Sequence, residues 1–263
     1  MQRLNHWYRI LATGFCFVSF GVGGVLLSIT VFPLQRLFIR DVEQRKFQAR
    51  NTVHITFKGF IALMRFVGIF NFNLTAATKL REARGQIIIA NHPSLIDVVA
   101  LIAMTPQADC VVKAQLFRNP FMRGVITSTG YISNSDPDKL LDDCAASLQK
   151  GNNLIIFPEG TRTTPGAELF FQRGAANIGL RARRGYLALY ICCQPSTLTK
   201  QEKWYQVPAT KPRLSIQYLK DIQLDDNLET IQSPSLAARQ LTRDLQIFYQ
   251  QAVKQHELFE TRT

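Results

Sequence analysis

Three features are scarce in this sequence: cysteine pairs, acidic residues, and repeated or biased segments. Five cysteines are an odd number and show no C-x-x-C spacing, which indicates a reduced, cytosol-facing body without structural zinc. No internal repeat or low-complexity segment interrupts the 263 residues, and a hydrophobic content of 46% excludes a disordered chain or a disulfide-stapled miniature fold. The length leads us to expect one domain of catalytic size.

Basic residues outnumber acidic ones. The chain has 31 Lys and Arg against 19 Asp and Glu, which gives a formal net charge of +12. A balance of this sign favours an anionic partner, which could be nucleic acid, an anionic bilayer surface or a phosphate-bearing substrate. Charge alone does not choose among these partners.

Charge is absent altogether from residues 10–35, which are rich in Phe, Val, Leu, Ile and Gly. At about 1.5 Å per residue, a helix of this length crosses a bilayer core of about 30 Å. The run lacks a small-x-small cleavage site at its end, which argues against a signal peptide. We therefore expect a retained membrane helix or a half-inserted hairpin bent at Gly21, Gly23 and Gly24, with a buried globular helix as the alternative.

Basic residues flank this run unevenly. Two arginines precede it, and five cations follow it: Arg36, Arg40, Arg45, Lys46 and Arg50. By the positive-inside rule, the domain that follows lies on the cytoplasmic side. We divide the chain into a membrane anchor with its basic flank, residues 1–50, and a folded domain, residues 51–263. The stretch 53–70 is apolar with two cations and fits a core-packing helix and an interfacial helix equally well.

Apolar runs and helical patterns alternate along the rest of the chain. Short buried strands are predicted at 86–90, 111–112, 153–157, 186–191 and 214–219. Helices are predicted at 94–102, 138–150, 174–184 and 235–253. This alternation predicts an α/β fold with a mostly parallel central sheet and helices on both faces. In such sheets, ligands bind at the carboxyl ends of the strands.

A histidine and an aspartate follow the first of these strands. His92 stands at the predicted strand end, and Asp97 comes within about one helical turn of it. A carboxylate that holds one ring nitrogen fixes the tautomer and leaves the other nitrogen as a general base. Taken alone, the pair also fits a helix cap without catalytic meaning.

A second polar cluster follows the predicted strand at 153–157. Glu159, Gly160 and Arg162 provide a carboxylate, a permissive backbone position and an anion-binding guanidinium. An ordinary turn would explain this segment alone, but two such segments at neighbouring strand ends favour a site. Neither G-x-S-x-G nor a clear Cys and His pairing is present, and Cys192 and Cys193 fit a core position, so direct transfer without a covalent enzyme intermediate is expected.

Together the two segments resemble a known family. Residues 91–97, N-H-P-S-L-I-D, resemble the N-H-x4-D block, and residues 157–162 match the F-P-E-G-T-R block, of the lysophospholipid acyltransferases typified by 1-acylglycerol-3-phosphate acyltransferase. The resemblance implies the glycerolipid acyltransferase fold for the domain. It also implies O-acyl transfer from a coenzyme A or acyl-carrier-protein thioester to the hydroxyl of a lyso-lipid such as 1-acylglycerol-3-phosphate. Both donors are co-substrates, and no bound cofactor or metal is implied.

The resemblance also assigns roles by position. It implies that His92 is the base that activates the acceptor hydroxyl and that Asp97 orients it. Lys113 matches a basic position that the family uses near the acceptor phosphate. Acceptor binding and the shape of the site are implied for four consecutive residues: Glu159, Gly160, Thr161 and Arg162.

The sequence departs from the family pattern at two places. After Gly130 the family has an apolar pair and then an arginine that helps to hold the acceptor phosphate, whereas here the first cation is Lys139. The late V-P-V-A-like strand lacks its proline at 187–191. Segments 171–178 and 203–205 are similar to small bacterial relatives encoded with aryl-polyene or other specialised lipid pathways. We therefore expect lysophosphatidic acid to be a poor acceptor or one of several, with a specialised non-phosphate lipid as the alternative.

Two other classes of function compete with acyl transfer. The apolar anchor and basic flanks would suffice for a non-catalytic membrane-binding protein, but lipid binding does not require His92, Asp97 and Glu159 together. No nucleic-acid motif accompanies the basic cluster at 181–184, so nucleic acid is not an expected partner. The expected partners are membrane lipids and the thioester donor. The expected location is the bacterial inner membrane, with the catalytic domain on the cytoplasmic face.

Overall fold

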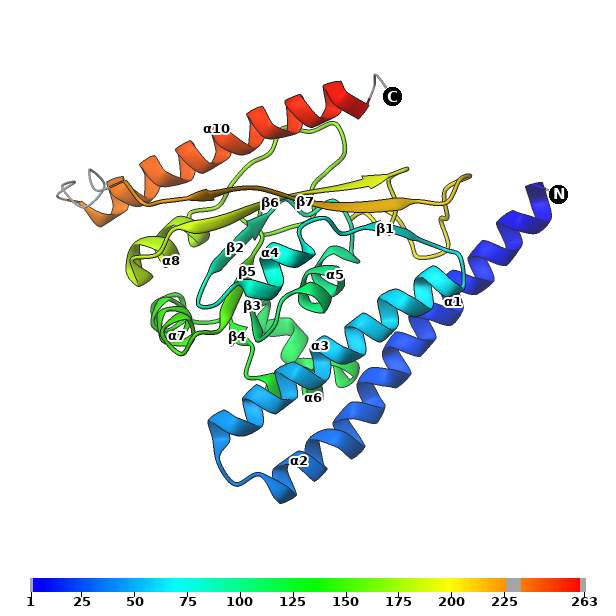
Figure 1. Ribbon diagram of the computed structural model, residues 1–263, viewed down its shortest axis with the longest axis horizontal. Helices are drawn as coiled ribbons and strands as arrows, with labels where there is room; N and C mark the ends of the chain where they lie inside the picture. The colour runs from blue at the N-terminus through cyan, green and yellow to red at the C-terminus, as the bar shows by residue number, and fades with distance from the viewer. Residues whose placement is uncertain (1, 226–232, 261–263) are drawn as a thin grey trace.

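A seven-stranded sheet forms the centre of this computed structural model, which describes residues 2–225 and 233–260 (Figure 1). The strands are β1 (Asn71–Asn73), β2 (Ile87–Ala90), β3 (Ala108–Val112), β4 (Ile132–Ser133), β5 (Asn153–Ile156), β6 (Tyr186–Gln194) and β7 (Arg213–Ile222). Their order is β1-β7-β6-β2-β5-β3-β4. All pairs are parallel except β6 with β7, which is antiparallel. The prediction of a mostly parallel sheet is confirmed.

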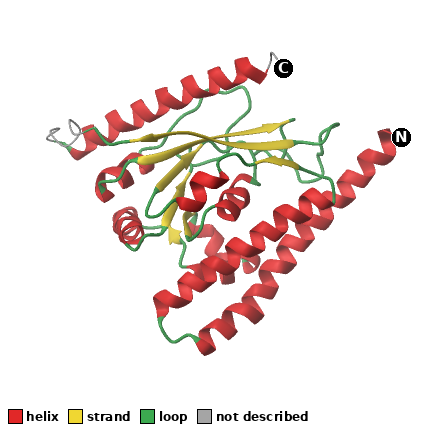
Figure 2. Cartoon of the chain, in the orientation of Figure 1, coloured by secondary structure: helices red, strands yellow, loops and turns green. Residues whose placement is uncertain are grey.

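Helices cover both faces of the sheet (Figure 2). They are α1 (Gln2–Leu26), α2 (Phe32–Phe38), α3 (Val42–Phe66), α4 (Ala77–Glu82), α5 (Asp97–Met104), α6 (Pro120–Thr129), α7 (Pro137–Gln149), α8 (Gly174–Ala182) and α10 (Pro234–Glu260), with a π-helical turn η1 (Leu27–Val31) and a 3-10 turn η2 (Ala114–Arg118). Side chains alternate along the strands, so Ile88 joins the core under α1, α3, α5 and α6, whereas Ile87 and Ile89 join the core under α7, α8 and α10.

The predicted elements differ from the structure mainly at their ends. The helix expected at 94–102 begins at Asp97, because residues 94–96 form a turn in which the Asp97 N–H donates to the Ser94 carbonyl at 3.3 Å. Helix α6 was not predicted, although Asn119 accepts a hydrogen bond from the Phe121 N–H and Pro120 opens the first turn. The strand expected at 214–219 is the antiparallel strand β7.

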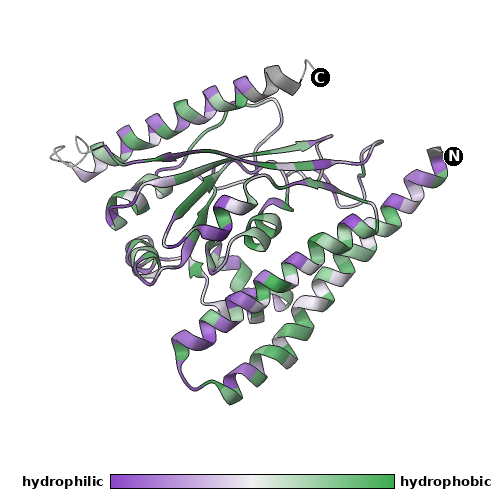
Figure 3. Ribbon diagram, viewed as in Figure 1, coloured by the Kyte–Doolittle hydropathy of each residue, from purple (hydrophilic) through white to green (hydrophobic). Residues whose placement is uncertain are grey.

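The apolar N-terminal run is one continuous helix. It extends from Arg3 to Phe38 through α1, η1 and α2, and it is long and apolar enough to cross a membrane (Figure 3). Only 11% of its most apolar 18-residue stretch is buried against the rest of the protein. The alternative of a buried globular helix is therefore wrong. The bend expected at the glycines is also wrong, because the chain reverses at 39–41, where Asp41 caps α3 by accepting the Gln44 N–H at 2.7 Å.

The glycines in this helix allow close packing instead of a bend. A Cβ on Gly24 would lie 2.9 Å from the Phe121 carbonyl oxygen, and a Cβ on Gly124 would collide with the side chain of Ser28. Among the described residues, no atom lies within 4 Å of a Cβ built on Gly23. Small residues thus let α1 and η1 approach α6 closely, as in other helix pairs with small-xxx-small spacing.

Helix α3 runs antiparallel beside α1 and packs on the domain with its other side (Figure 1). Val53, Ile61 and Met64 are buried in the core, whereas Phe57 and Phe60 contact the Phe20 ring of α1. The core-packing interpretation of 53–70 therefore describes the buried face of this helix. The expected division between residues 50 and 51 falls inside α3.

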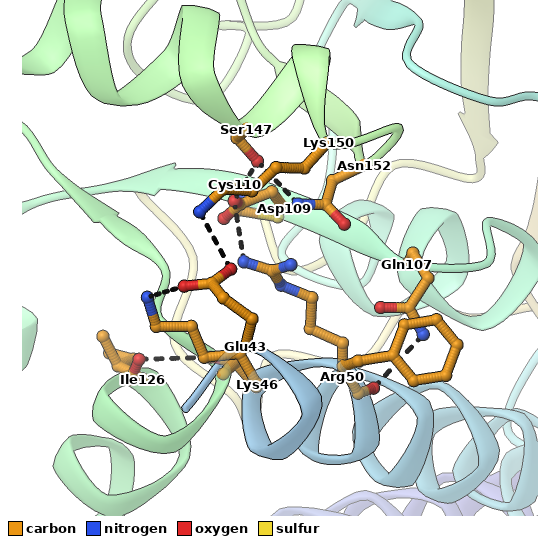
Figure 4. A network of polar contacts seen from close by, with 12 residues as sticks. Glu43, Lys46, Arg50, Gln107, Asp109, Cys110, Ile126, Ser147, Lys150 and Asn152 are labelled. Atoms are coloured by element: carbon orange, nitrogen blue, oxygen red, sulfur yellow. Dashed lines mark hydrogen bonds and ion pairs between the residues drawn. The ribbon is translucent and has the colours of Figure 1, made fainter. Parts of the chain in front are cut away.

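A buried ion pair joins α3 to the sheet (Figure 4). The Arg50 guanidinium contacts Asp109 Oδ2 at 3.1 Å, and the side-chain exposures of Arg50 and Asp109 are 7% and 1%. The Ser147 hydroxyl of α7 donates to the same carboxylate oxygen at 2.6 Å. Burial raises the pKa of Asp109, and the Arg50 charge opposes this shift. The pair fixes the start of α3 against β3.

Candidate active site

The two polar segments singled out in the sequence meet at the carboxyl edge of the sheet. Strands β2 and β5 are neighbours, with Ile89 opposite Ile156. The chain leaves β2 into the His92 segment and leaves β5 into the Phe157 segment, so both turns lie at the same edge. This is where an α/β sheet of this type binds its ligands.

His92 and Asp97 are in direct contact. The His92 Nδ1 atom lies 2.9 Å from Asp97 Oδ2, and the same oxygen accepts the Ser94 N–H at 2.7 Å. The His92 ring stacks on the Phe157 ring at 4.1 Å between centroids and keeps 14% of its side chain exposed. A proton on Nδ1 that is donated to Asp97 leaves Nε2 with a lone pair, so this nitrogen can accept a proton from a substrate.

Asp97 is completely buried at the base of this pair. Its Oδ1 atom has no hydrogen-bond partner within the described residues. Burial raises the pKa of Asp97, and the bond to His92, the Ser94 N–H and the Arg162 charge oppose this rise. The carboxylate is thus positioned to stabilise a proton on the imidazole.

Glu159 holds the backbone of His92 in place. Its Oε1 atom accepts the Thr163 hydroxyl at 2.6 Å and the His92 N–H at 3.1 Å. The His92 N–H also donates to Thr163 Oγ1 at 2.9 Å, and the Thr163 N–H donates to the His92 carbonyl at 2.7 Å. Burial raises the pKa of Glu159, and the Thr163 and His92 bonds oppose the rise. Thr163 was not predicted, although it directly follows the six-residue motif.

The other predicted residues lie around this core of the site. Gly160 has φ +65° and donates its N–H to the Phe157 carbonyl at 2.9 Å, a left-handed turn that favours glycine. Thr161 is partly exposed beside it. Arg162 donates through Nη1 to the carbonyls of Leu198 and Thr199 at 2.9 and 2.8 Å.

Lys113 lies at the same edge of the sheet but farther away. It follows β3, which is separated from β2 by β5 in the strand order, and it is exposed. Two strand spacings amount to roughly 10 Å, so Lys113 lies beyond direct contact with the His92 ring. The structure brings together His92, Asp97 and Glu159, and it places Lys113 at the periphery.

Two polar side chains that hold the site together, those of Asn91 and Ser94, were not predicted individually from the sequence. The Asn91 amide donates to the Ile191 carbonyl at 2.7 Å and accepts the Ile191 N–H at 2.8 Å, which ties the turn after β2 to β6. The Ser94 hydroxyl donates to the Thr197 carbonyl at 2.9 Å. Their positions in the N-H-P-S segment were the available signal, but their partners are about 100 residues away in the chain.

Comparison with known proteins finds a family match and several related sequences. Residues 71–196, which contain both turns, match the Acyltransferase family. The chain is 37% identical over 101 residues to a 1-acyl-sn-glycerol-3-phosphate acyltransferase of Helicobacter pylori, a match that covers 36% of this chain and 43% of that protein. It is 27% identical over 186 residues to a chloroplast enzyme of that name from Brassica napus, covering 66% of this chain and 50% of the relative.

A third relative has a different named acceptor. The chain is 26% identical over 166 residues to a lyso-ornithine lipid O-acyltransferase of Brucella abortus, covering 60% of this chain and 58% of that protein. The chain thus spans about half the length of the curated relatives it matches.

The fold also matches a crystal structure. A 1-acyl-sn-glycerophosphate acyltransferase from Thermotoga maritima superimposes with a TM-score of 0.64 at 18% sequence identity, covering 97% of this chain and 99% of that one. At this identity the likeness establishes the fold, in agreement with the α/β architecture and the long N-terminal helix described above.

Proposed function

The chain belongs to the Acyltransferase family, and from this premise we propose that it transfers a fatty acyl group from a coenzyme A or carrier-protein thioester to the hydroxyl of a membrane lyso-lipid. The observation that carries the proposal is the contact of 2.9 Å between His92 Nδ1 and the fully buried Asp97 carboxylate. A helix cap alone would explain the pair, but its place at the ligand-binding edge of the sheet beside the turn at 157–162 favours catalysis over simple membrane binding.

The proposed reaction needs no covalent enzyme intermediate. His92 Nε2 removes the proton of the acceptor hydroxyl as its oxygen attacks the thioester carbonyl carbon. The new C–O bond forms, the C–S bond breaks, and the imidazolium returns the proton to the departing thiolate. Asp97 stabilises the imidazolium between these two steps, and Glu159 with Thr163 keeps the His92 backbone fixed.

We also propose that the acceptor is not restricted to lysophosphatidic acid. The region where the family pattern has an arginine forms β4 and a turn, in which Asn134 donates its N–H to Val112 at 3.1 Å and accepts the Ala114 N–H at 3.0 Å. Lys113 and Arg162 remain as cations on the acceptor side. Fewer cations weaken recognition of a phosphate monoester, because each charge-assisted hydrogen bond contributes roughly 1.5 to 3 kcal/mol.

Replacement of the proposed base tests the reaction. His92→Ala in purified protein should lower acyl transfer by about 10²-fold to 10⁴-fold while the circular dichroism spectrum stays unchanged. His6→Ala, at an exposed histidine on α1, is the matched control and should transfer at the parent rate. Transfer by folded His92→Ala at the parent rate would contradict the proposal.

Competition among acceptors tests the substrate class. The protein is offered lysophosphatidic acid beside neutral and zwitterionic lyso-lipids, with coenzyme A and carrier-protein donors in parallel. We expect mixed use of acceptors, and Arg162→Ala should reduce transfer to anionic acceptors most. An exclusive preference for lysophosphatidic acid would show that another group replaces the missing arginine.

The location follows from the same features. We propose that the protein resides in the bacterial inner membrane through its apolar helix, with the domain on the cytoplasmic face. The five cations after the apolar run support this orientation.

A further inference from the structure

The connection between β6 and β7, residues 195–212, is fixed to the catalytic turn. The Ser94 hydroxyl donates to the Thr197 carbonyl at 2.9 Å, and the Leu95 N–H donates to the Leu198 carbonyl at 3.1 Å. Arg162 adds two bonds to the carbonyls of this connection. A shift of the connection therefore changes the surroundings of His92 and Asp97.

The same connection is fixed to the apolar N-terminal helix. Arg9, only 5% exposed, donates through its two terminal nitrogens to the carbonyls of Pro208 and Thr210, each at 2.7 Å. The Trp204 ring lies 6.3 Å from the Phe17 ring, and a Cβ on Gly14 would be 3.2 Å from the indole. The connection thus bridges α1 and the candidate active site.

The middle of this connection exposes an aromatic pair with a cation, which we call the aromatic tip (Lys203, Trp204 and Tyr205). Trp204 and Tyr205 are 45% and 43% exposed and pack edge to face at 5.6 Å between ring centroids. The Lys203 ammonium lies 5.7 Å from the Tyr205 ring centroid. Exposed Trp and Tyr beside Lys are the residues enriched where proteins meet the headgroup region of a bilayer.

Charge and position favour a bilayer as the occupant of this surface. The connection has three lysines and one acidic residue, Glu202, whose carboxylate accepts the Thr199 N–H at 3.0 Å. Trp204 packs on the same stretch of α1 that exposes Leu11, Phe15 and Val18 at 71%, 54% and 63%. The aromatic tip therefore lies next to exposed apolar side chains of the helix that is long and apolar enough to enter a bilayer.

We propose that the aromatic tip is a second membrane-contact surface and that it sets the position of the catalytic turn at the bilayer. Contact of Trp204 and Tyr205 with headgroups fixes the depth of the 195–212 connection at the bilayer surface. The bonds of this connection to Ser94 and Arg162 then place the catalytic turn at the level of an embedded acceptor. The residues of the tip are positioning residues in this scheme. The effect on catalysis rests on the proposed acyl transfer, whereas the contact itself does not.

Fluorescence tests the contact without turnover. The chain has two tryptophans, so Trp7→Phe leaves Trp204 as the sole tryptophan, whose emission is excited selectively over that of the tyrosines. In nanodiscs of phosphatidylcholine and phosphatidylglycerol, lipids with a nitroxide at the headgroup or at acyl carbon 5 should quench Trp204 more strongly than lipids labelled at carbon 12. Iodide should quench it weakly. Strong iodide quenching without nitroxide quenching would overturn the proposal, as would protection of Trp204 only by added acyl-carrier protein.

A comparison of two acceptors tests the positioning effect. The double variant with Trp204→Ser and Tyr205→Ser should transfer about fivefold less to a long-chain acceptor embedded in nanodiscs. This is the loss expected for removing one aromatic contact. Transfer to a monomeric short-chain acceptor in water should stay at the parent rate. Tyr218→Ser, at an exposed tyrosine of β7 that is 38% accessible, is the matched control. Equal losses on both acceptors would overturn the positioning role, whereas a parent protein inactive on both would refute the proposed function and leave the fluorescence result intact.

Discussion

The Asp97 carboxylate is more deeply buried than the other titratable groups at the centre of the candidate site, His92 and Glu159. It is fully buried, and its Oδ1 atom has no partner within the described part of the chain. An ionised carboxylate in such a place lowers the stability of the folded state. The same placement lets the carboxylate hold His92 in one tautomer and stabilise a protonated imidazole. The protein thus loses some folding stability at the position where the proposed reaction needs a negative charge.

Replacing this carboxylate by its amide separates activity from stability. Asp97→Asn presents an N–H₂ group or an oxygen to His92, but it no longer stabilises the imidazolium. Acyl transfer should fall by about 10²-fold to 10⁴-fold. The melting temperature should stay equal or rise, because a buried charge is removed. Parallel losses of activity and melting temperature would contradict this prediction.

The pH dependence of stability gives a second measure of the same variant. Burial raises the folded-state pKa of Asp97 above that of the unfolded chain. A group of this kind favours folding while protonated, and this contribution is lost as the pH rises through its folded-state pKa. The stability of Asp97→Asn relative to the parent should therefore increase from acidic to neutral pH, as measured by chemical unfolding.

Among the helices and strands, those whose formation depends on residues close together in the sequence were predicted from local patterns. Buried strands, the two polar turns and the closing helix α10 follow from apolar periodicity and strand ends. Helix α6 was missed even though Asn119 and Pro120 mark its start, because its apolar pattern is short. The Arg50 to Asp109 pair could not be predicted, since α3 and β3 meet only through the tertiary fold.

Close packing of η1 on α6 leads to a prediction about glycine. Gly124→Val would force a side chain into Ser28 and should destabilise the protein by about 1 to 3 kcal/mol. Gly23→Val is the matched control, because it lies in the same apolar helix and no atom of the described part of the chain comes within 4 Å of a Cβ built there. Thermal unfolding in detergent measures both variants, and equal melting temperatures for the two would show that the contact does not hold the helix to the domain.

Breaking the buried ion pair between α3 and β3 should lower the free energy of unfolding by an amount that depends on pH. Arg50→Met leaves Asp109 unpaired and should reduce the free energy of unfolding at neutral pH by about 3 to 5 kcal/mol. Because burial already raises the pKa of Asp109, loss of Arg50 raises it further, and protonation relieves the defect as the pH falls. Chemical unfolding should therefore show a smaller defect at acidic pH. Adding Asp109→Asn should recover most of the loss, and a defect that is constant with pH would contradict this account.

At the scale of the whole molecule, both ends of the apolar helix contact the domain. Near its start, Arg9 bonds to residues 208 and 210, and the Tyr8 hydroxyl donates to the Val67 carbonyl at 2.6 Å. Near its end, Gln35 donates to the Thr52 hydroxyl at 2.9 Å. The helix of 36 residues is about 54 Å long, well beyond a hydrocarbon core of about 30 Å.

These contacts lead us to predict a half-inserted helix with both ends on the domain side. The charged domain cannot follow either end of the helix across the hydrocarbon core. Asn5→Cys and Gln44→Cys introduce exposed thiols at the two ends of the apolar segment, whereas the five native cysteines are free and buried. A membrane-impermeant maleimide should label both variants in inside-out vesicles and neither in intact spheroplasts. Labelling of Asn5→Cys only in spheroplasts would show instead that the helix spans the bilayer, and that the Arg9 contacts with the 195–212 connection are broken in the membrane.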